Sequence, residues 1–448
     1  MAVRSQGRAL SYDILKRSAQ GIPSLSHLLE NIDQQEIENR ELSLAYELIM
    51  GVTRWLKKID YILSLFSKKS VSSLDIPVKT ALRLGVYQMF FLERIPHRAA
   101  IDESVELVKK DKGLSGASFV NGVLRRISRE ASKIRFPERG SDSVRRLTIM
   151  TSHPEWMVSR WLERFGESEA EEILNANNSR PATSLWVNRK RYSMQSLIEG
   201  LREEGVEVIP SRYIDDALTV KTGSVHRTDI FRKGGCYIQD EASQMIPLIF
   251  GSELYGKAAD LCAAPGGKSL KLAQLLSGDG FIVGIDLSFS RLLVFKENIA
   301  RLNVENIFLI GSDSEKGTPL KCPFDLVLVD APCSGTGVIR RNPDIKWRLR
   351  QEDIISHSAR QVRILEEAKK IVKRGGLLLY SVCSIEKEET EAVVASFLSA
   401  DRRFRLEDPG ERLPERARQF VCKGPYFRTF PHRDGLDGFF AALLKRTA

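Results

Sequence analysis

From about residue 236 onward, short apolar segments alternate with segments of helical periodicity. The apolar runs have strand length and cover residues 258–262, 280–286, 307–310, 324–330 and 377–381. Helical patterns lie between them, as in residues 268–277 and 290–302. This alternation is typical of a doubly wound parallel sheet with helices on both faces. Ligands bind such sheets beyond the carboxyl ends of the strands, so the residues that follow each strand are the candidates for chemistry.

The preceding chain has two parts of different character. Residues 8–135 show helical periodicity alone, and residues 136–143 are rich in breakers and polar side chains, as in a linker. Residues 145–235 mix short strand and helix patterns. We therefore expect a multidomain chain: an all-α domain over 1–138, a small α+β domain over 145–235, and an α/β domain with a Rossmann-like, mostly parallel sheet over 236–448.

The charge distribution favours a polyanionic partner. The 448 residues carry a net charge of +10, and residues 1–135 hold 22 Lys and Arg against 15 Asp and Glu. A basic module fits nucleic acid, although a solvated basic surface explains the charge alone equally well. The six cysteines show no C-x-x-C spacing, so we expect neither a metal site nor a disulfide framework. No apolar run reaches the ~18 residues of a membrane span, and no secretory segment opens the chain. These features predict a cytoplasmic protein.

The first strand of the predicted sheet leads into a glycine-containing loop, with the sequence Cys262, Ala263, Ala264, Pro265, Gly266, Gly267, Lys268. The two glycines let a ligand approach the backbone where the next helix begins. A phosphate-binding Walker loop requires glycine where Cys262 stands, and the dinucleotide pattern G-x-G-x-x-G is absent. An adenosine cofactor without a phosphate to hold is therefore favoured over a nucleotide phosphate on Gly-Lys-Ser, and a purely structural turn is the remaining alternative.

Acidic residues follow the next three strands. Asp286 ends the second strand, where it can accept hydrogen bonds from ribose hydroxyls. Asp313 follows the third strand, and Asp330 ends the fourth. Aspartate often caps a turn after a strand, so each signal is weak alone. Together with the glycine loop they predict a cofactor site.

Two cysteines, Cys333 and Cys383, follow the fourth and fifth strands. A lone cysteine is usually an inert buried residue, but two at matched strand ends beside a carboxylate suit pyrimidine methylation. A thiolate that adds to carbon 6 of cytosine activates carbon 5 toward a methyl donor. Asp330 could stabilise charge on the ring, and Lys268 could lower the pKa of the attacking thiol. The spacing leaves open which cysteine attacks, because DNA cytosine methyltransferases use the cysteine of a Pro-Cys pair.

These motifs resemble the RNA 5-methylcytosine methyltransferases of the Nop2/Sun type, over nearly the whole chain. Further matching segments are residues 341–347 and 432–440. The resemblance implies that Cys383 is the nucleophile, that Cys333 helps to release the product, and that S-adenosylmethionine binds the loop 262–268 with the three aspartates named above. One departure is Val382, where the family usually has threonine before the nucleophile, which puts one local hydrogen bond in doubt.

The N-terminal helices resemble the NusB-type RNA-binding fold in residues 96–107 and 119–126. This combination implies a member that acts on small-subunit ribosomal RNA, with no DNA or membrane partner, and we expect a monomer. The alternatives are a transfer-RNA cytosine-5 methyltransferase and a non-catalytic RNA-binding or antitermination factor.

Overall fold

The computed structural model describes the chain except residues 1–4, 22–24, 31, 33–36, 141 and 422–423. Contacts divide the chain into two compact units. The first comprises Met1–Ser179 with Ile339–Arg348, and the second comprises Arg180–Val338 with Leu349–Ala448. Among the described residues, no helix is both long and apolar enough to cross a membrane.

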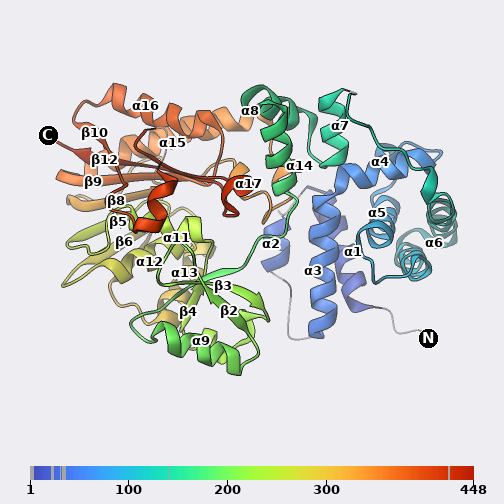
Figure 1. The fold of residues 1–448 in the computed structure, drawn as a ribbon, viewed down its shortest axis with the longest axis horizontal. Helices are drawn as coiled ribbons and strands as arrows, with labels where there is room; N and C mark the ends of the chain where they lie inside the picture. The colour runs from blue at the N-terminus through green and yellow to red at the C-terminus, as the bar shows by residue number, and fades with distance from the viewer. Residues whose placement is uncertain (1–4, 22–24, 31, 33–36, 141, 422–423) are drawn as a thin grey trace. The chain divides into compact units, whose positions relative to one another are not determined.

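The first unit is helical, as the periodicity predicted (Figure 1). In α3 the apolar residues Leu42, Ala45, Ile49 and Val52 follow helical spacing and are all buried, so this stripe faces the core. The helices are α1 Gln6–Ala19, α2 Leu25–Glu30, α3 Asn39–Arg54, α4 Leu56–Phe66, α5 Ile76–Phe91, α6 His97–Arg129, α7 Ser143–Met150, α8 Glu155–Ala176 and α14 Ile345–Arg348.

Helices α7 and α8 group with this helical unit, although the sequence placed them with the middle domain. The buried Arg146 of α7 pairs with Glu171 of α8 at 2.9 Å and with Glu167 at 3.2 Å. The segment Ile339–Arg348 joins the same unit because the ammonium of Lys346 donates to the carbonyl of Ser152 at 2.8 Å. The predicted division into three domains stays a prediction, and the two contact units part at residue 179 instead.

The second unit begins with a four-stranded antiparallel sheet in the order β2-β3-β1-β4. Its elements are β1 Ser184–Val187, α9 Met194–Glu203, β2 Glu207–Pro210, β3 Ala217–Thr222, α10 Asp229–Arg232 and β4 Cys236–Ile238. The first three strands and α9 lie where the sequence predicted them. Strand β4 lies within the residues that the sequence assigned to the third domain, but it pairs with β1, and Cys236 is fully buried in the small sheet's apolar cluster.

The larger sheet has eight strands in the order β10-β12-β9-β8-β5-β6-β7, with β11 paired to β12. Strands β5 to β9 are mutually parallel and β12 runs antiparallel to β9, which confirms the mostly parallel Rossmann-like fold. The elements are α11 Glu241–Leu248, β5 Lys257–Asp260, α12 Gly267–Leu275, β6 Phe281–Asp286, α13 Phe289–Leu302, β7 Ile307–Gly311, β8 Phe324–Asp330, α15 Gln351–Ile371, β9 Val372–Val382, α16 Glu391–Ala400, β10 Phe404–Glu407, β11 Tyr426–Thr429, α17 Pro431–Asp434 and β12 Phe439–Arg446.

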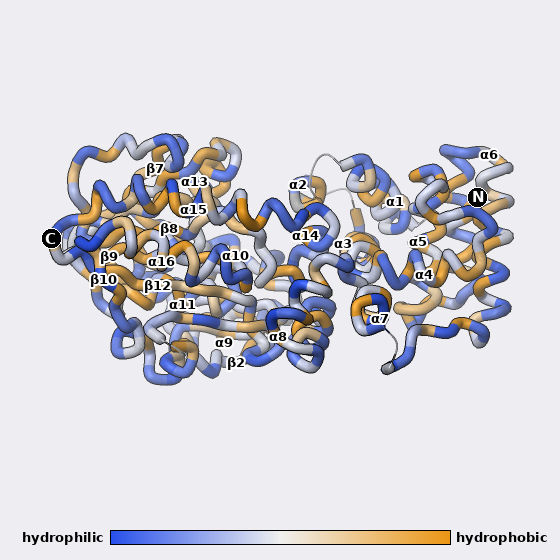
Figure 2. Tube along the Cα trace, turned by 90° about the horizontal axis from the view of Figure 1, so that it is seen from above, coloured by the Kyte–Doolittle hydropathy of each residue, from blue (hydrophilic) through white to orange (hydrophobic). Residues whose placement is uncertain are grey.

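Both faces of this sheet are buried. Helices α15 and α16 cover one face and α11, α12 and α13 the other (Figure 1). Alternate residues of β8 therefore enter different cores: Leu326 and Leu328 pack toward α11 and α12, whereas Val327 and Val329 pack toward α15. The hydropathy colouring of Figure 2 shows the resulting hydrophobic strands β8, β9 and β12.

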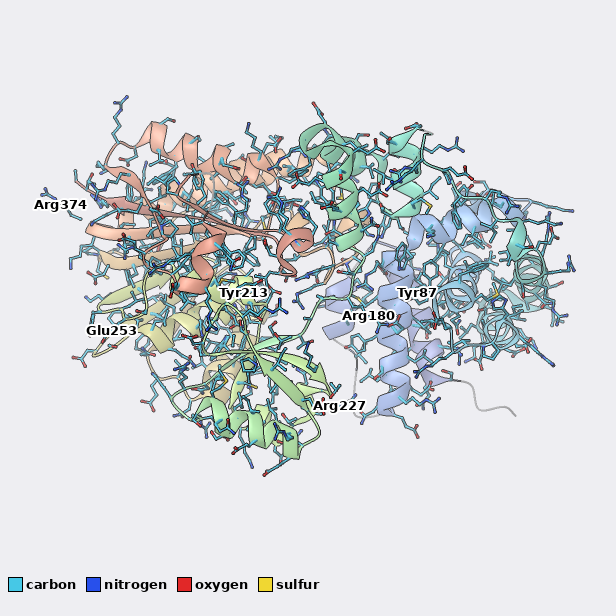
Figure 3. All side chains as sticks on the ribbon, viewed as in Figure 1. Tyr87, Arg180, Tyr213, Arg227, Glu253 and Arg374 are labelled. Carbon is cyan, nitrogen blue, oxygen red and sulfur yellow. The ribbon has the colours of Figure 1, made fainter. Side chains whose placement is uncertain are left out.

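The two ends of the parallel strands differ in character. Glu253, just before β5, and Arg374, near the start of β9, mark the amino ends, and both lie toward the same side of the unit in Figure 3. The glycine loop, the aspartates and the cysteines of the sequence analysis follow the opposite, carboxyl ends. This edge of the sheet is where a doubly wound fold binds its ligand.

Candidate active site

Residues from five strand ends line one cavity of about 400 Å³. Predicted site residues among them are Cys262, Ala264, Asp286, Asp313, Asp330, Cys333 and Cys383. The other predicted residues, Ala263, Pro265, Gly266, Gly267 and Lys268, line a smaller cavity of about 240 Å³ that shares Cys262, Ala264 and Asp330 with the first. Every predicted site residue thus borders one of two cavities that adjoin the loop after β5.

The loop after β5 is shaped by Gly266. Its φ of +103° is left-handed, and a Cβ added there would lie 2.0 Å from Cδ2 of Phe295 in α13. Both facts exclude a side chain at this position. Below the loop, buried Asp260 accepts hydrogen bonds from Ser269 Oγ at 2.6 Å and from the N–H of Cys262 at 3.3 Å. Burial raises the pKa of Asp260 to about 7.

Asp286 fixes the same loop from the next strand. Its Oδ2 accepts the N–H of Ala264 at 3.0 Å, and its Oδ1 accepts the N–H of Ser288 at 2.9 Å. A carboxylate has about four lone-pair sites, so each oxygen can accept one more hydrogen bond from a ligand hydroxyl. Asp286 lines the large cavity beside the apolar side chain of Leu287.

These residues fit S-adenosylmethionine. The cavity volume is in the range of small-molecule sites. Asp286 offers acceptors to ribose hydroxyls, Leu261 and Leu287 offer apolar surface to the base, and the carboxylates of Asp313 and Asp330 suit a ligand that carries a positive sulfonium. The bare backbone at Gly266 and Gly267 leaves room beside the loop.

The two thiols meet at the wall of the large cavity. Cys333 Sγ and Cys383 Sγ lie 3.4 Å apart, and both residues are partly exposed. The hydrogen bond with Cys383, together with burial, raises the pKa of the Cys333 thiol well above its usual value. The backbone carbonyl of Cys383 also accepts the N–H of Gly337 at 3.0 Å, which ties the loop after β9 to the loop after β8.

Lys268 contacts Asp330. Its ammonium lies 2.6 Å from Oδ2 of Asp330 and 4.9 Å above the ring of Phe439. Ser381 Oγ donates to the other oxygen of Asp330 at 2.8 Å. The prediction that Lys268 lowers the pKa of the attacking thiol stays a prediction. The structure shows an ammonium and a hydroxyl that together hold the Asp330 carboxylate at the cavity wall.

Two further features lie next to the thiols. One is the residue before Cys383, and the other is a set of buried polar residues. Val382 is fully buried in the apolar cluster against α15 and α16, so its side chain packs in the core. Glu389 was not among the predicted site residues, and its buried carboxylate accepts hydrogen bonds from Ser334 and Ser384. Within the acidic segment 386–391, Glu386 and Glu389 are both buried, whereas Glu388 and Glu391 are partly exposed, and no simple sequence signal separates these two classes.

Three known protein-family models match separate parts of the chain. The family model described as 16S rRNA methyltransferase RsmB/F matches residues 255–445. The NusB family model matches residues 8–129, and a ferredoxin-like domain of RsmF/B-like methyltransferases matches residues 153–226. The resemblance of the N-terminal helices to the NusB fold is thereby confirmed.

Similar proteins cover nearly the full length. The chain is 36% identical to the probable ribosomal RNA small subunit methyltransferase B of Bacillus subtilis, over 93% of each chain. It is 32% identical to the ribosomal RNA small subunit methyltransferase B of Pseudomonas putida, over 92% of each. The crystal structure of the protein PH0851 covers 100% of both chains with a TM-score of 0.80 and 25% identity. A methyltransferase homologue from Pyrococcus horikoshii matches at 28% identity and a TM-score of 0.58, over 68% of this chain and 99% of that one. The chain therefore belongs to the RsmB/F family of 16S rRNA methyltransferases, with N-terminal helices of the NusB family.

Proposed function

We propose that this protein methylates carbon 5 of one cytosine in small-subunit ribosomal RNA, with Cys383 as the nucleophile. The family makes it a small-subunit ribosomal RNA methyltransferase that uses S-adenosylmethionine. The cytosine, the carbon and the roles of the thiols belong to the proposal. The observation that carries them is the 3.4 Å approach of two thiols in the cavity that fits the cofactor.

Cys383 Sγ, as the thiolate, bonds carbon 6 of the cytosine, and the electron pair of the 5,6 double bond becomes available at carbon 5. The cofactor supplies the electrophilic methyl group that carbon 5 takes up. A base then removes the proton from carbon 5, the double bond re-forms, and Sγ leaves carbon 6 as the thiolate. The target base must leave its stack for this attack.

Asp330 and Cys333 have supporting roles in this scheme. Asp330, held by Lys268 and Ser381, faces the cavity and can accept a hydrogen bond from the exocyclic amine at the pyrimidine edge, which orients the ring for attack. Cys333 has a raised thiol pKa and therefore stays protonated at neutral pH. A protonated thiol next to the nucleophile suits the release of the product, since it can exchange a proton there.

The test uses two single variants of the full-length protein. Cys383→Ala should abolish transfer of labelled methyl groups to ribosomal RNA. Cys333→Ala should accumulate a covalent complex with RNA that survives denaturing electrophoresis. The reverse pattern would refute the assignment of roles, and methyl transfer by Cys383→Ala would refute the mechanism.

The position of the methyl group is tested separately. Bisulfite sequencing of ribosomal and transfer RNA from cells with and without the gene should show one cytosine in small-subunit ribosomal RNA that loses protection when the gene is absent. A lost signal in transfer RNA would point to the transfer-RNA alternative, and no lost signal in either would refute the cytosine-5 assignment.

A further inference from the structure

One buried carboxylate, that of Glu389, contacts both cysteine-bearing loops from behind the cavity. Ser334 follows Cys333 directly, and it donates its backbone N–H to Oε1 of Glu389 at 2.8 Å and its hydroxyl to Oε2. Ser384 follows Cys383 directly and donates its hydroxyl to the same Oε2 at 2.5 Å. The residue after each cysteine is therefore bonded to the same carboxylate.

The other hydrogen bonds of Glu389 extend this link. Gln361 of α15 donates from Nε2 to Oε1 of Glu389 at 3.0 Å and to the carbonyl of Pro332 at 3.0 Å. The Cys333 loop is thus held on both sides of the cysteine. Tyr380 of β9 donates its hydroxyl to the backbone carbonyl of Glu389 at 2.6 Å, which fixes the backbone that carries the carboxylate.

Glu389 is fully buried, and the contacts of its carboxylate named above are neutral donors from the backbone, two hydroxyls and an amide. A buried carboxylate is costly, and a well-packed apolar residue often serves stability as well or better. The arrangement is therefore better explained by what the carboxylate holds in place than by a gain in stability. It holds two serine hydroxyls 3.2 Å apart, next to two thiols that are 3.4 Å apart.

We infer that Glu389 is a positioning residue that sets the relative placement of the Cys333 and Cys383 thiols, without touching substrate itself. This inference rests on the proposed function, in which both thiols act on one base. Catalytic groups must be held within about 0.5 Å of their productive geometry, and a misplacement of about 1 Å can cost 10²-fold in rate. A loop freed from Glu389 can shift by such an amount.

The two informative substitutions differ in what they keep. Glu389→Ala removes the acceptor for all four donors, so both loops lose their common anchor. Glu389→Gln keeps the length and Oε1, and the hydroxyls of Ser334 and Ser384 can rotate to accept from the new amide N–H. Glu389→Gln should therefore rescue most of the function if placement, and not negative charge, is what Glu389 supplies.

The experiment compares these variants in the full-length protein on a small-subunit ribosomal RNA transcript. We expect Glu389→Ala to lower the single-turnover rate of methyl transfer about 100-fold and Glu389→Gln to stay within about 10-fold of the native rate. The dissociation constant for S-adenosylmethionine, measured by calorimetry, should change less than about 3-fold in both Glu389 variants, because the hydrogen bonds between Glu389 and the two cysteine loops do not involve Asp286. Adduct formation should be correspondingly slower in Cys333→Ala/Glu389→Ala than in Cys333→Ala.

The matched control is Glu391→Ala, which removes a nearby carboxylate that pairs with Arg428; its rate should stay close to native. The inference is overturned if Glu389→Ala transfers methyl groups at the native rate, if it loses cofactor affinity in proportion to rate, or if Glu389→Gln is folded but as slow as Glu389→Ala. If Glu389→Ala does not fold, Ser384→Ala replaces it, because this variant removes only the hydrogen bond between Ser384 and Glu389. The inference then requires slower adduct formation in Ser384→Ala than in the native protein. Cys383→Ala is run in parallel: if it remains active the proposed function fails, whereas an inactive Cys383→Ala with a fully active Glu389→Ala refutes only the role of Glu389.

Discussion

The substitution Gly266→Ala tests whether the shape of the glycine loop after β5 depends on the absence of one side chain. Gly266 is the residue before α12, with a φ of +103° and a ψ of −4°. Its new methyl group would lie 2.0 Å from Cδ2 and 2.3 Å from Cε2 of Phe295, where real Cβ contacts do not occur. Phe295 is fully buried and cannot swing into solvent. The loop must therefore move away from α13 if the protein is to accept the methyl group.

The expected cost has two parts. A left-handed backbone costs a residue with a Cβ about 1–2 kcal/mol, and overpacking in a dense core typically costs about 1–3 kcal/mol. We expect Gly266→Ala to lower the free energy of unfolding by about 2–5 kcal/mol. Because the loop also carries the Ala264 N–H that bonds Asp286, affinity for S-adenosylmethionine should fall at least about 10-fold.

A second glycine with a left-handed backbone but open space around it separates the backbone cost from the overpacking cost. Gly375 has a φ of +80°, and a Cβ there meets nothing within 4 Å. Gly375→Ala should therefore cost only the backbone part and leave cofactor affinity unchanged. Urea unfolding measures stability, and calorimetric titration measures cofactor binding. Equal losses of stability in the two variants, or native cofactor affinity in Gly266→Ala, would refute the argument that Phe295 shapes the loop.

Two further predictions concern buried ionisable groups. The pKa of Asp260 is about 7 in the folded state and about 3.9 in the unfolded state. Between these pH values the folded protein keeps a proton on Asp260 that the unfolded chain has lost. The free energy of unfolding should therefore fall by up to about 4 kcal/mol from pH 4 to pH 7. Asp260→Asn should flatten this dependence in thermal unfolding measured from pH 5 to pH 8, and an unchanged slope would contradict it. Lys346→Met leaves the buried acceptors of Arg54, Ser152 and Asn178 without their donor and should lower the free energy of unfolding by about 3 kcal/mol; a urea midpoint equal to that of the native protein would contradict this.

The strands and the strand-end residues were predictable because their signals are local. A strand buried on both faces is a short apolar run, so the expected strand 324–330 coincides with β8. The convergence of Asp286, Asp330 and Cys383 on one cavity then follows from their place at strand ends, since parallel strands bring their carboxyl ends to one edge. Loop and sheet rules alone thus locate the cavity.

The features that the sequence did not predict depend on contacts between residues that are far apart in the chain. Residues 339–348 follow the Cys333 loop in sequence, yet Lys346 bonds the backbone carbonyl of Arg54, 292 residues away. Strand β4 joins the small sheet through pairing with β1, and a three-residue strand carries no signal that names its partner. Glu389 looks like one more solvated acid in an acidic segment. In each case the partner, and not the residue's own pattern, decides the role.

The surroundings of the two thiols bear on which cysteine attacks the base, a question that the sequence spacing left open. The thiols adjoin the same cavity, but Cys333 sits in a loop held on both sides by Gln361 and Glu389, and its hydrogen bond with Cys383 raises its pKa. The thiolate is the form that attacks, so a thiol that keeps its proton at neutral pH is suited to proton exchange instead. A rule that takes the Pro-Cys cysteine as nucleophile would assign the attack to this protonated thiol. A proton-exchanging Cys333 is compatible with the proposed roles of the two thiols, and the comparison of Cys383→Ala with Cys333→Ala decides between the two assignments.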